Sequence, residues 1–193
     1  MNSGVYEMER IFLAGGLIVF YGVMFYSGIK QKRQGRDSSG RPPLTRALFI
    51  PGKAAMGVSW AILVIQLTGF DLRQFDPGAR VLWGAVLLLY AGLALCVPIY
   101  FQLGQNLKFG LPEEGESTLC MSGLYRVSRN PMYLGFYLMT AASCFYAPSV
   151  VNILCACIGI AIHHMTVLSE EKFLVNEHGD VYLDYMARVR RYI

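Results

Sequence analysis

Two groups of polar residues in the C-terminal half of the chain have the types and the spacing that ligand binding or catalysis needs. The first is Arg129-Asn130-Pro131, which stands where a polar segment gives way to a charge-free run. Proline fits the first turn of a helix, because its missing N–H would be unpaired there, and Asn130 can cap that turn. The free amides of a helix start favour an anion, and the guanidinium of Arg129 adds a forked donor. The pattern predicts a corner that accepts a carboxylate.

The second group lies further along the chain. His163, Thr166 and Glu170 are spaced to share one helical face, and His164 and Glu171 belong to the neighbouring face. Ionisable side chains on a membrane helix are costly unless they face the bundle or water, so we expect this face to complete the site. Adjacent histidines point about 100° apart on a helix. Since the sequence has no H-E-x-x-H pattern either, we expect no metal.

Residues 104–130 form a polar segment that leads into the first group. It holds side chains that a small polar ligand could use, namely Asn106, Lys108, Ser117, Thr118, Tyr125, Arg126 and Arg129. An ordinary solvated loop has a similar composition, so the segment by itself leaves both interpretations open.

Long apolar runs must position these groups. Charged residues are 16% of the chain and apolar residues 54%, whereas a soluble domain has roughly 25% charged residues. Four runs are free of charge: 11–29, 54–70, 81–107 and 130–169. A crossing needs about 20 apolar residues, so the first three runs give one crossing each. The fourth is long enough for two, with a hairpin tip at Ala147-Pro148-Ser149. We predict an all-α, polytopic membrane protein with about five transmembrane helices.

The basic residues predict the orientation. They gather in the loop 30–46, in the segment 104–130 and in the tail from residue 170 on, and five crossings place all three segments on one side. Positive loops mark the cytoplasmic side, so we expect a cell-membrane protein with its N-terminus outside and its C-terminus and active site in the cytoplasm. The loop 30–46 favours anionic membrane lipids. A nucleic-acid partner is not expected, because no soluble fold stands behind the basic residues.

The C-terminal tail is amphipathic. Its apolar residues are interrupted by His178-Gly179-Asp180, which predicts a helix extension, a glycine stop and an amphipathic helix on the membrane surface. We expect one domain overall, in which residues 1–103 are a transmembrane scaffold and residues 104–193 form the cofactor-binding catalytic region.

Three ordered motifs of the second half resemble the signature of the isoprenylcysteine carboxyl methyltransferase and phospholipid methyltransferase family. They are R-N-P-M-Y-L-G at 129–135, E-E-K-F-L at 170–174, and G-D-V-Y-L-D-Y at 179–185 continued through Val189-Arg190. The match covers about residues 104–193. It implies an enzyme that transfers a methyl group from S-adenosylmethionine to a lipophilic acceptor, either an isoprenylcysteine-type carboxylate or a lipid headgroup, which enters from the bilayer.

The resemblance also implies roles for individual residues. Glu170 would hold the amino end or the ribose of S-adenosylmethionine, and Arg129 would bind its carboxylate or the anion of the acceptor; these two are the expected catalytic residues. The expected cofactor-binding residues are Ser117, Thr118, Leu119, Cys120, Tyr125, Asn130, Pro131, Met132, Tyr133, His163 and Glu170.

Two positions depart from the family pattern. Asn130 replaces the usual histidine, a change that the phospholipid branch tolerates. Thr166, the expected substrate residue, stands where eukaryotic isoprenylcysteine enzymes carry an arginine for the substrate, which argues against a prenylated cysteine carboxylate. Two other functions stay open: a membrane reductase that uses a nicotinamide cofactor, and a small non-catalytic binding or transport subunit. A transporter would normally show internal repeats, and none is visible in the sequence.

Overall fold

The computed structural model describes residues 3–33, 41–103, 111 and 119–193, and these are mostly helical. The elements are α1 (Ser3–Arg33), α2 (Arg46–Leu67), α3 (Gly78–Leu103), the 3-10 helix η2 (Gly123–Arg126), α4 (Pro131–Tyr146), α5 (Val150–His178) and α6 (Asp180–Arg188). Strand pairing within the described ranges is limited to one isolated antiparallel bridge, between Arg41 and Leu111. The predicted all-α class is confirmed.

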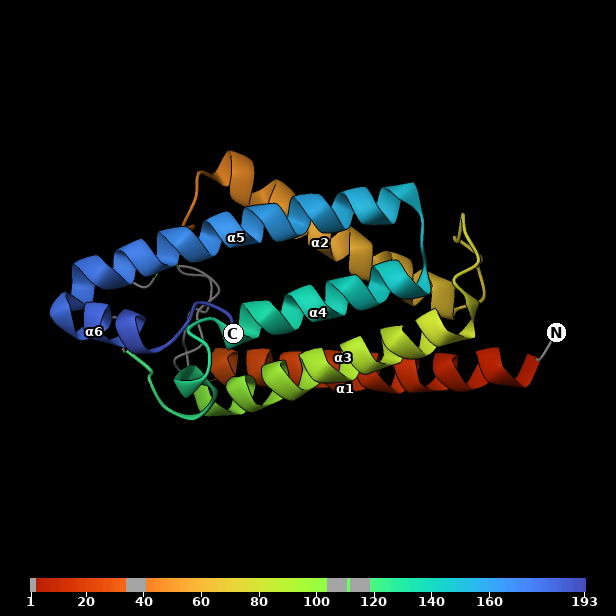
Figure 1. Ribbon diagram of the computed structural model, residues 1–193, viewed down its shortest axis with the longest axis horizontal. Coiled ribbons are helices and arrows are strands. Elements are labelled where there is room, and N and C mark those ends of the chain that lie inside the picture. The colour runs from red at the N-terminus through yellow and green to blue at the C-terminus, as the bar shows by residue number, and fades with distance from the viewer. Residues whose placement is uncertain (1–2, 34–40, 104–110, 112–118) are drawn as a thin grey trace.

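The helices α1 to α5 run back and forth along the long axis of the molecule (Figure 1). Among the described helices, α1 from Glu7 on, α2, α3 and α5 are long and apolar enough to cross a membrane. The remaining predicted crossing, α4, has 16 residues, or about 24 Å of helix. That is shorter than a hydrocarbon core of roughly 30 Å. α4 lies inside the bundle, in contact with α2, α3 and α5.

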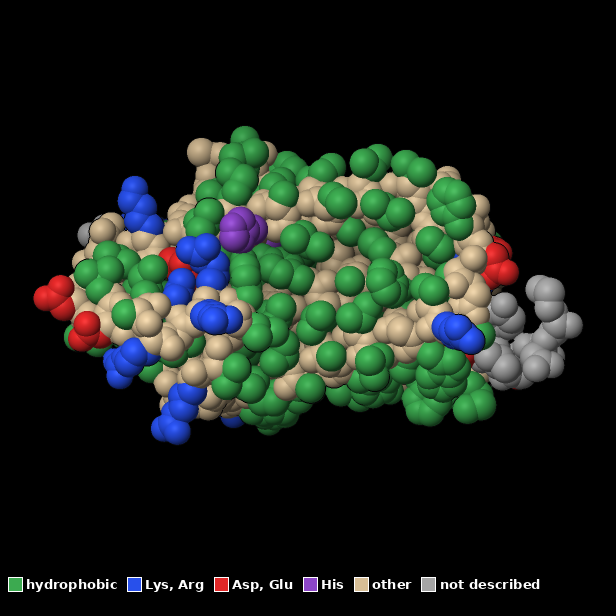
Figure 2. Space-filling model, in the orientation of Figure 1, with side chains coloured by type: hydrophobic (Ala, Val, Ile, Leu, Met, Phe, Trp, Pro, Cys, Tyr) green, Lys and Arg blue, Asp and Glu red, His purple; other side chains and the backbone are tan. Residues whose placement is uncertain are grey.

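The helix ends that carry basic residues meet at one end of the bundle. α1, α3 and α5 finish there, α2 and α4 begin there, and α6 lies beside them (Figure 1). We call this the basic end, after Lys30, Lys32, Arg33, Arg46, Arg126, Arg129, Lys172, Arg188, Arg190 and Arg191. On the visible face, Lys and Arg side chains gather mostly at this end and hydrophobic side chains cover the length of the bundle (Figure 2). The described basic residues of the three segments therefore lie at one end, as predicted.

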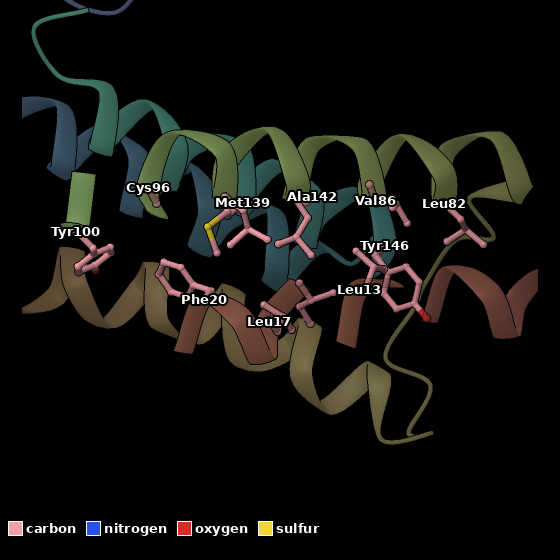
Figure 3. Close-up of a cluster of buried hydrophobic side chains, with 14 residues drawn as sticks. Leu13, Leu17, Phe20, Leu82, Val86, Cys96, Tyr100, Met139, Ala142 and Tyr146 are labelled. Atoms are coloured by element: carbon pink, nitrogen blue, oxygen red, sulfur yellow. The ribbon is translucent and has the colours of Figure 1, made fainter. Parts of the chain in front are cut away.

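α4 packs tightly against α3. A Cβ atom on Gly135 would lie 2.5 Å from Cys96 Sγ and 2.9 Å from the Gly92 carbonyl oxygen, so glycine lets the two backbones approach. The core beside this contact also takes side chains from α1. Its labelled members are Leu13, Leu17, Phe20, Leu82, Val86, Cys96, Tyr100, Met139, Ala142 and Tyr146 (Figure 3).

α2 packs against α5 in the same manner. A Cβ atom on Gly159 would lie 3.0 Å from the Met56 backbone nitrogen, and one on Gly52 would collide with Ile162. Nearby, the buried Asn152 side chain accepts from Ser59 Oγ at 2.6 Å and donates to the Ala147 carbonyl at 3.0 Å. Two helices of the first half therefore pack along the second half, α3 on α4 and α2 on α5. Their division into scaffold and catalytic region stays a prediction about function.

The turn between α4 and α5 and the helix break in the tail lie where the sequence predicted them. α4 ends at Tyr146 and α5 begins at Val150, so Ala147-Pro148-Ser149 is the turn, and Ser149 Oγ accepts from the Asn152 amide at 3.3 Å. α5 ends at His178, because Gly179 adopts φ +52°, a conformation that disfavours a side chain. α6 buries Tyr182 and Tyr185 and leaves its charged residues exposed.

Candidate active site

Tyr133 of α4 and Glu170 of α5 are joined across the helix interface. The Tyr133 hydroxyl donates to Glu170 Oε1 at 2.7 Å. The His163 ring lies edge-on to the Tyr133 ring, with the centroids 6.2 Å apart. Tyr133 stands in the first turn of α4 because Pro131 opens that helix, as predicted. The structure thus brings together three of the expected cofactor-binding residues, at the basic end of the bundle.

The hydrogen bond of His163 fixes which ring nitrogen carries the proton. His163 Nδ1 lies 2.8 Å from the Gly159 carbonyl oxygen, one turn back along α5. A carbonyl oxygen can only accept, so Nδ1 must be the donor. In the neutral imidazole Nε2 is then the nitrogen with the lone pair, which can take a proton.

η2 carries Tyr125, which is partly buried. Burial raises the pKa of Tyr125, with smaller contributions from Cys120, Tyr185 and Glu170. Tyr185 of α6 donates to the Tyr125 carbonyl oxygen at 2.6 Å, and burial raises the pKa of Tyr185 to about 12. Both phenols therefore stay neutral donors at physiological pH.

Four more expected cofactor-binding residues, 117–120, belong to the polar segment before η2. Leu119 and Cys120 are partly buried, and Cys120 Sγ accepts from Gln102 Nε2 at 3.4 Å, which ties this stretch to the end of α3. Ser117 and Thr118 lie outside the described residues.

Arg129 and Glu171 form a second, separate cluster. Arg129 Nε donates to Glu171 Oε1 at 3.0 Å, and only 7% and 5% of the two side chains are exposed. Arg129 Nη1 also donates to the carbonyl oxygens of Met186 at 3.2 Å and Val189 at 2.6 Å. Arg191 Nε donates to Glu171 Oε2 at 2.9 Å, and this hydrogen bond raises the pKa of Arg191. We call Arg129, Glu171 and Arg191 the tail clamp, because they fasten α6 and the residues after it to α4 and α5.

Backbone hydrogen bonds extend the tail clamp. The amide of Arg129 donates to the Arg190 carbonyl oxygen at 2.9 Å, and that of Asn130 to the Arg191 carbonyl oxygen at 3.1 Å. The Tyr192 hydroxyl then reaches His164 Nδ1 at 2.7 Å and the Tyr137 hydroxyl at 3.3 Å. The tail therefore passes over the start of α4, next to the Tyr133–Glu170 pair.

Asn130 does not cap α4, contrary to the sequence expectation. Its side chain makes no capping hydrogen bond to the helix. Instead Nδ2 donates to Glu171 Oε1 at 3.0 Å and to the Arg191 carbonyl oxygen at 3.4 Å, so the side-chain amide is directed at α5 and the tail. Arg129, which we expected to bind a carboxylate of the cofactor or the anion of the acceptor, donates from its Nε and Nη1 atoms within the tail clamp.

The remaining expected residues, Pro131, Met132 and Thr166, are buried or partly buried in the bundle. Pro131 is buried at the first turn of α4. Met132 packs its side chain against the core of α1, α3 and α4, and its carbonyl oxygen accepts from Cys96 Sγ at 3.7 Å. Thr166 is 2% exposed and lies on α5 between His163 and Glu170. In the described part of the chain, no three His, Cys, Asp or Glu side chains lie close enough together to hold a metal ion.

Sequence reasoning missed Lys53, Arg191 and Tyr192. Lys53 belongs to α2 and interacts electrostatically with both Glu170 and His163. Its only sequence signal was that it interrupts an otherwise apolar run. Arg191 and Tyr192 stand in a short basic tail, where nothing in the local pattern says which helix they will contact.

Comparison with known proteins supports one of the three candidate functions. The sequence model of the family described as phospholipid methyltransferase matches residues 80–181, just over half of the 193-residue chain. The match starts inside α3, earlier than the range of about 104–193 expected from the motifs, and ends before Tyr182 and Tyr185. A search of curated proteins finds no match. Together with the apolar helices, the family match shows that the chain is a membrane methyltransferase and belongs to the phospholipid methyltransferase family.

Proposed function

We propose that the protein transfers a methyl group from S-adenosylmethionine to a lipophilic acceptor at the basic end of its bundle. The observation that carries this proposal is the Tyr133–Glu170 hydrogen bond beside His163. It joins the first turn of α4 to α5 within the family-matched region. Neither residue is part of the tail clamp, so both are available to a ligand in a way that Arg129 and Glu171 are not.

The donor set suits the proposed cofactor. The Glu170 carboxylate accepts hydrogen bonds, as ribose hydroxyls or an amino group would require. The rings of Tyr133 and Tyr125 offer the aromatic faces that attract a cation such as a sulfonium. Asn130 and Pro131 hold the first turn of α4 in place, and we assign them a supporting role beside the cofactor.

S-adenosylmethionine supplies an electrophilic methyl group: the acceptor's lone pair forms a bond to that carbon, the carbon–sulfur bond breaks, and its electron pair stays on sulfur. The protein must align the two partners and exclude water, which supplies most of the rate. A carboxylate acceptor needs no base. An amine acceptor must lose a proton, and we assign this step to His163 Nε2, because its lone pair is not used by the Gly159 hydrogen bond.

The acceptor is proposed to be a lipid headgroup or an isoprenylcysteine-type carboxylate that arrives through the bilayer. The helices beside the site expose large apolar side chains along their length, which suits a lipophilic partner. The basic end is proposed to face the cytoplasm, because loops rich in Lys and Arg resist translocation.

Ligand binding and methyl uptake test the proposal. In detergent, isothermal titration should detect S-adenosylhomocysteine and give no heat with NADPH, which a reductase would bind. Incubation with S-adenosylmethionine that carries a radiolabelled methyl group, together with a membrane lipid extract, should label an organic-soluble product. Binding of NADPH without S-adenosylhomocysteine would overturn the proposal, as would the absence of labelled product.

A further inference from the structure

We propose that Gln102, at the end of α3, is a positioning residue for the methyl donor. It holds Tyr125 in place beside the sulfur of the cofactor, and so gives the protein a preference for cationic S-adenosylmethionine over its neutral product. This inference rests on the proposed function, which assigns Tyr125 to the cofactor, and it adds how the donor is distinguished from the product. The family match includes Gln102 but gives it no role.

The side-chain amide of Gln102 contacts the chain just before η2. Its Nε2 donates to the Ser122 carbonyl oxygen at 2.9 Å, to Ser122 Oγ at 3.1 Å and to Cys120 Sγ at 3.4 Å. An amide nitrogen has two hydrogens, and all three acceptors around it belong to one stretch of three residues. Gln102 therefore fastens residues 120–122, which include the expected cofactor-binding residue Cys120, to the end of α3.

The oxygen of the same amide lies against Gly123, the first residue of η2. A Cβ atom on Gly123 would lie 2.5 Å from Gln102 Oε1 and 3.0 Å from its Cδ. Gly123 also adopts φ +60°, a conformation that disfavours a side chain. Glycine at this position thus lets the amide of Gln102 lie directly on the turn that begins η2.

The contact reaches Tyr125 through one shared acceptor. The Ser122 carbonyl oxygen accepts from Gln102 Nε2 and also from the Tyr125 backbone amide, at 3.2 Å. The Tyr125 carbonyl oxygen in turn accepts from the Tyr185 hydroxyl of α6 at 2.6 Å. The backbone of Tyr125 is therefore held by α6 at its carbonyl and, through Ser122, by α3 at its amide.

The far end of this segment is fastened independently of α3. The backbone amides of Arg129 and Asn130 donate to carbonyl oxygens of the tail, and α4 begins at the next residue. Loss of the α3 contact would release the near end of the segment and leave the far end in place. We therefore expect Tyr125 to shift, while the hydrogen-bonded pair between α4 and α5 stays where it is.

An aromatic ring distinguishes the two forms of the cofactor by their charge. The sulfur of S-adenosylmethionine is a positively charged sulfonium, whereas that of S-adenosylhomocysteine is a neutral thioether. The face of a tyrosine ring attracts a cation electrostatically, and the neutral thioether lacks this attraction. A displaced Tyr125 ring would therefore weaken binding of the donor selectively, whereas a general loosening of the fold would weaken both ligands alike.

The test compares Gln102→Met with Gln74→Met, because methionine keeps the length of the side chain and removes its amide. Gln74 is a matched control at the opposite end of the bundle: it is exposed, and its Oε1 accepts from the Val150 backbone amide at 2.9 Å. Isothermal titration of the full chain in detergent, without an acceptor, measures the affinities for S-adenosylmethionine and S-adenosylhomocysteine. Thermal unfolding shows that each variant is folded at the temperature of the titration.

Gln102→Met should weaken binding of S-adenosylmethionine roughly threefold or more beyond its effect on S-adenosylhomocysteine, since a cation–π contact contributes on this scale. Gln74→Met should leave both affinities within about twofold of the wild type, as expected of a surface change away from the site. Tyr125→Leu should narrow the same preference for the donor. Adding Gln102→Met to Tyr125→Leu should narrow it little further, because both changes act on one ring.

Equal weakening of both ligands in Gln102→Met would overturn the inference, because it would show a structural role alone, and so would unchanged affinities. A full further loss of preference when Gln102→Met is added to Tyr125→Leu would also overturn it, since Gln102 would then act through another group. In each of these results the wild type still binds S-adenosylmethionine, and the proposed function stands. A wild-type protein that binds neither ligand would instead reject the proposed function, and this inference with it.

Discussion

Glu170 and Glu171 are neighbours in α5, yet their carboxylates belong to different clusters. Glu170 accepts from the Tyr133 hydroxyl at 2.7 Å, whereas Glu171 accepts from Arg129 at 3.0 Å and from Arg191 at 2.9 Å. Successive residues on a helix point about 100° apart, so an E-E pair can serve a ligand with one carboxylate and the fold with the other. This division makes the two glutamates separable by mutation.

The first prediction concerns ligand binding at Glu170. Glu170→Gln should weaken S-adenosylhomocysteine binding roughly 10- to 150-fold, because a hydrogen bond to a charged group is worth about 1.5–3 kcal/mol. Tyr133→Phe should cost less, and the double variant should lose less than the sum, since the two side chains share a hydrogen bond. Isothermal titration in detergent measures all four proteins. Asp184→Asn, at an exposed position of α6, is the control. Unchanged affinity in Glu170→Gln would remove this residue from the site.

The second prediction concerns stability at Glu171. Glu171→Ala should lower the free energy of unfolding by about 3–5 kcal/mol, because it leaves the buried Arg129 without its carboxylate. The same change in an Arg129→Met background should cost clearly less. Thermal unfolding in detergent, followed by tryptophan fluorescence, gives the comparison. An equal loss of Tm in both backgrounds would show that the two side chains are not coupled.

The third prediction concerns Glu9 in α1, at the opposite end of the bundle. Its side chain is fully buried, and neither carboxylate oxygen has a hydrogen-bond partner within the described structure. Glu9→Met should therefore raise stability by about 1–3 kcal/mol, since an unsatisfied buried polar group costs that much. Glu7→Met, at an exposed position two residues earlier, should leave the Tm nearly unchanged. A lower Tm for Glu9→Met would mean that the carboxylate has a partner in the membrane.

The fourth prediction concerns the glycine of the R-N-P-M-Y-L-G motif. Gly135→Ala should destabilise the protein by about 1–3 kcal/mol, because its methyl group would meet Cys96 Sγ and the Gly92 carbonyl oxygen. Gly57→Ala, where the added Cβ has open space, should be neutral or gain up to about 1 kcal/mol from helix propensity. Both are read from Tm. Equal Tm values for the two variants would place α3 and α4 further apart than described.

The fifth prediction concerns orientation. In a background without the native cysteines, Ser38→Cys should be labelled by an impermeant maleimide only after cell lysis, because the basic loop 30–46 is expected in the cytoplasm. Asp76→Cys, in the connection between α2 and α3 at the other end of the bundle, should be labelled on intact cells. The opposite pattern would invert the protein in the membrane.

The helices were predictable because each depends on local patterns. Charge-free runs predicted α1 to α5. Pro148 predicted the turn between α4 and α5, and Gly179 predicted the end of α5. These features need only residue types and their spacing. The family resemblance also named Tyr133 and Glu170 as cofactor-binding residues, but the hydrogen bond between them was not predicted.

The long-range contacts were not predictable from the sequence. Arg129 could serve a ligand or a carboxylate, and only the position of the tail shows that Glu171 takes it. Lys53 interrupts an apolar run, but its nearness to Glu170 depends on how closely Gly52 lets α2 approach α5. Asn130 could cap α4, but its side chain instead donates from Nδ2 to a carboxylate of another helix.

The shortness of α4 has a consequence for the membrane around the protein. α5 has 29 residues and α4 has 16, or about 44 and 24 Å of helix. The first turn of α4, with Tyr133, therefore begins below the level that α5 reaches, inside the cross-section of the bundle. Hydrophobic mismatch then becomes a variable of catalysis: a thicker bilayer would draw acceptor headgroups away from Tyr133, and a thinner one would bring them level with it. Lipid chain length should accordingly change the rate of methyl transfer without any change in the headgroup.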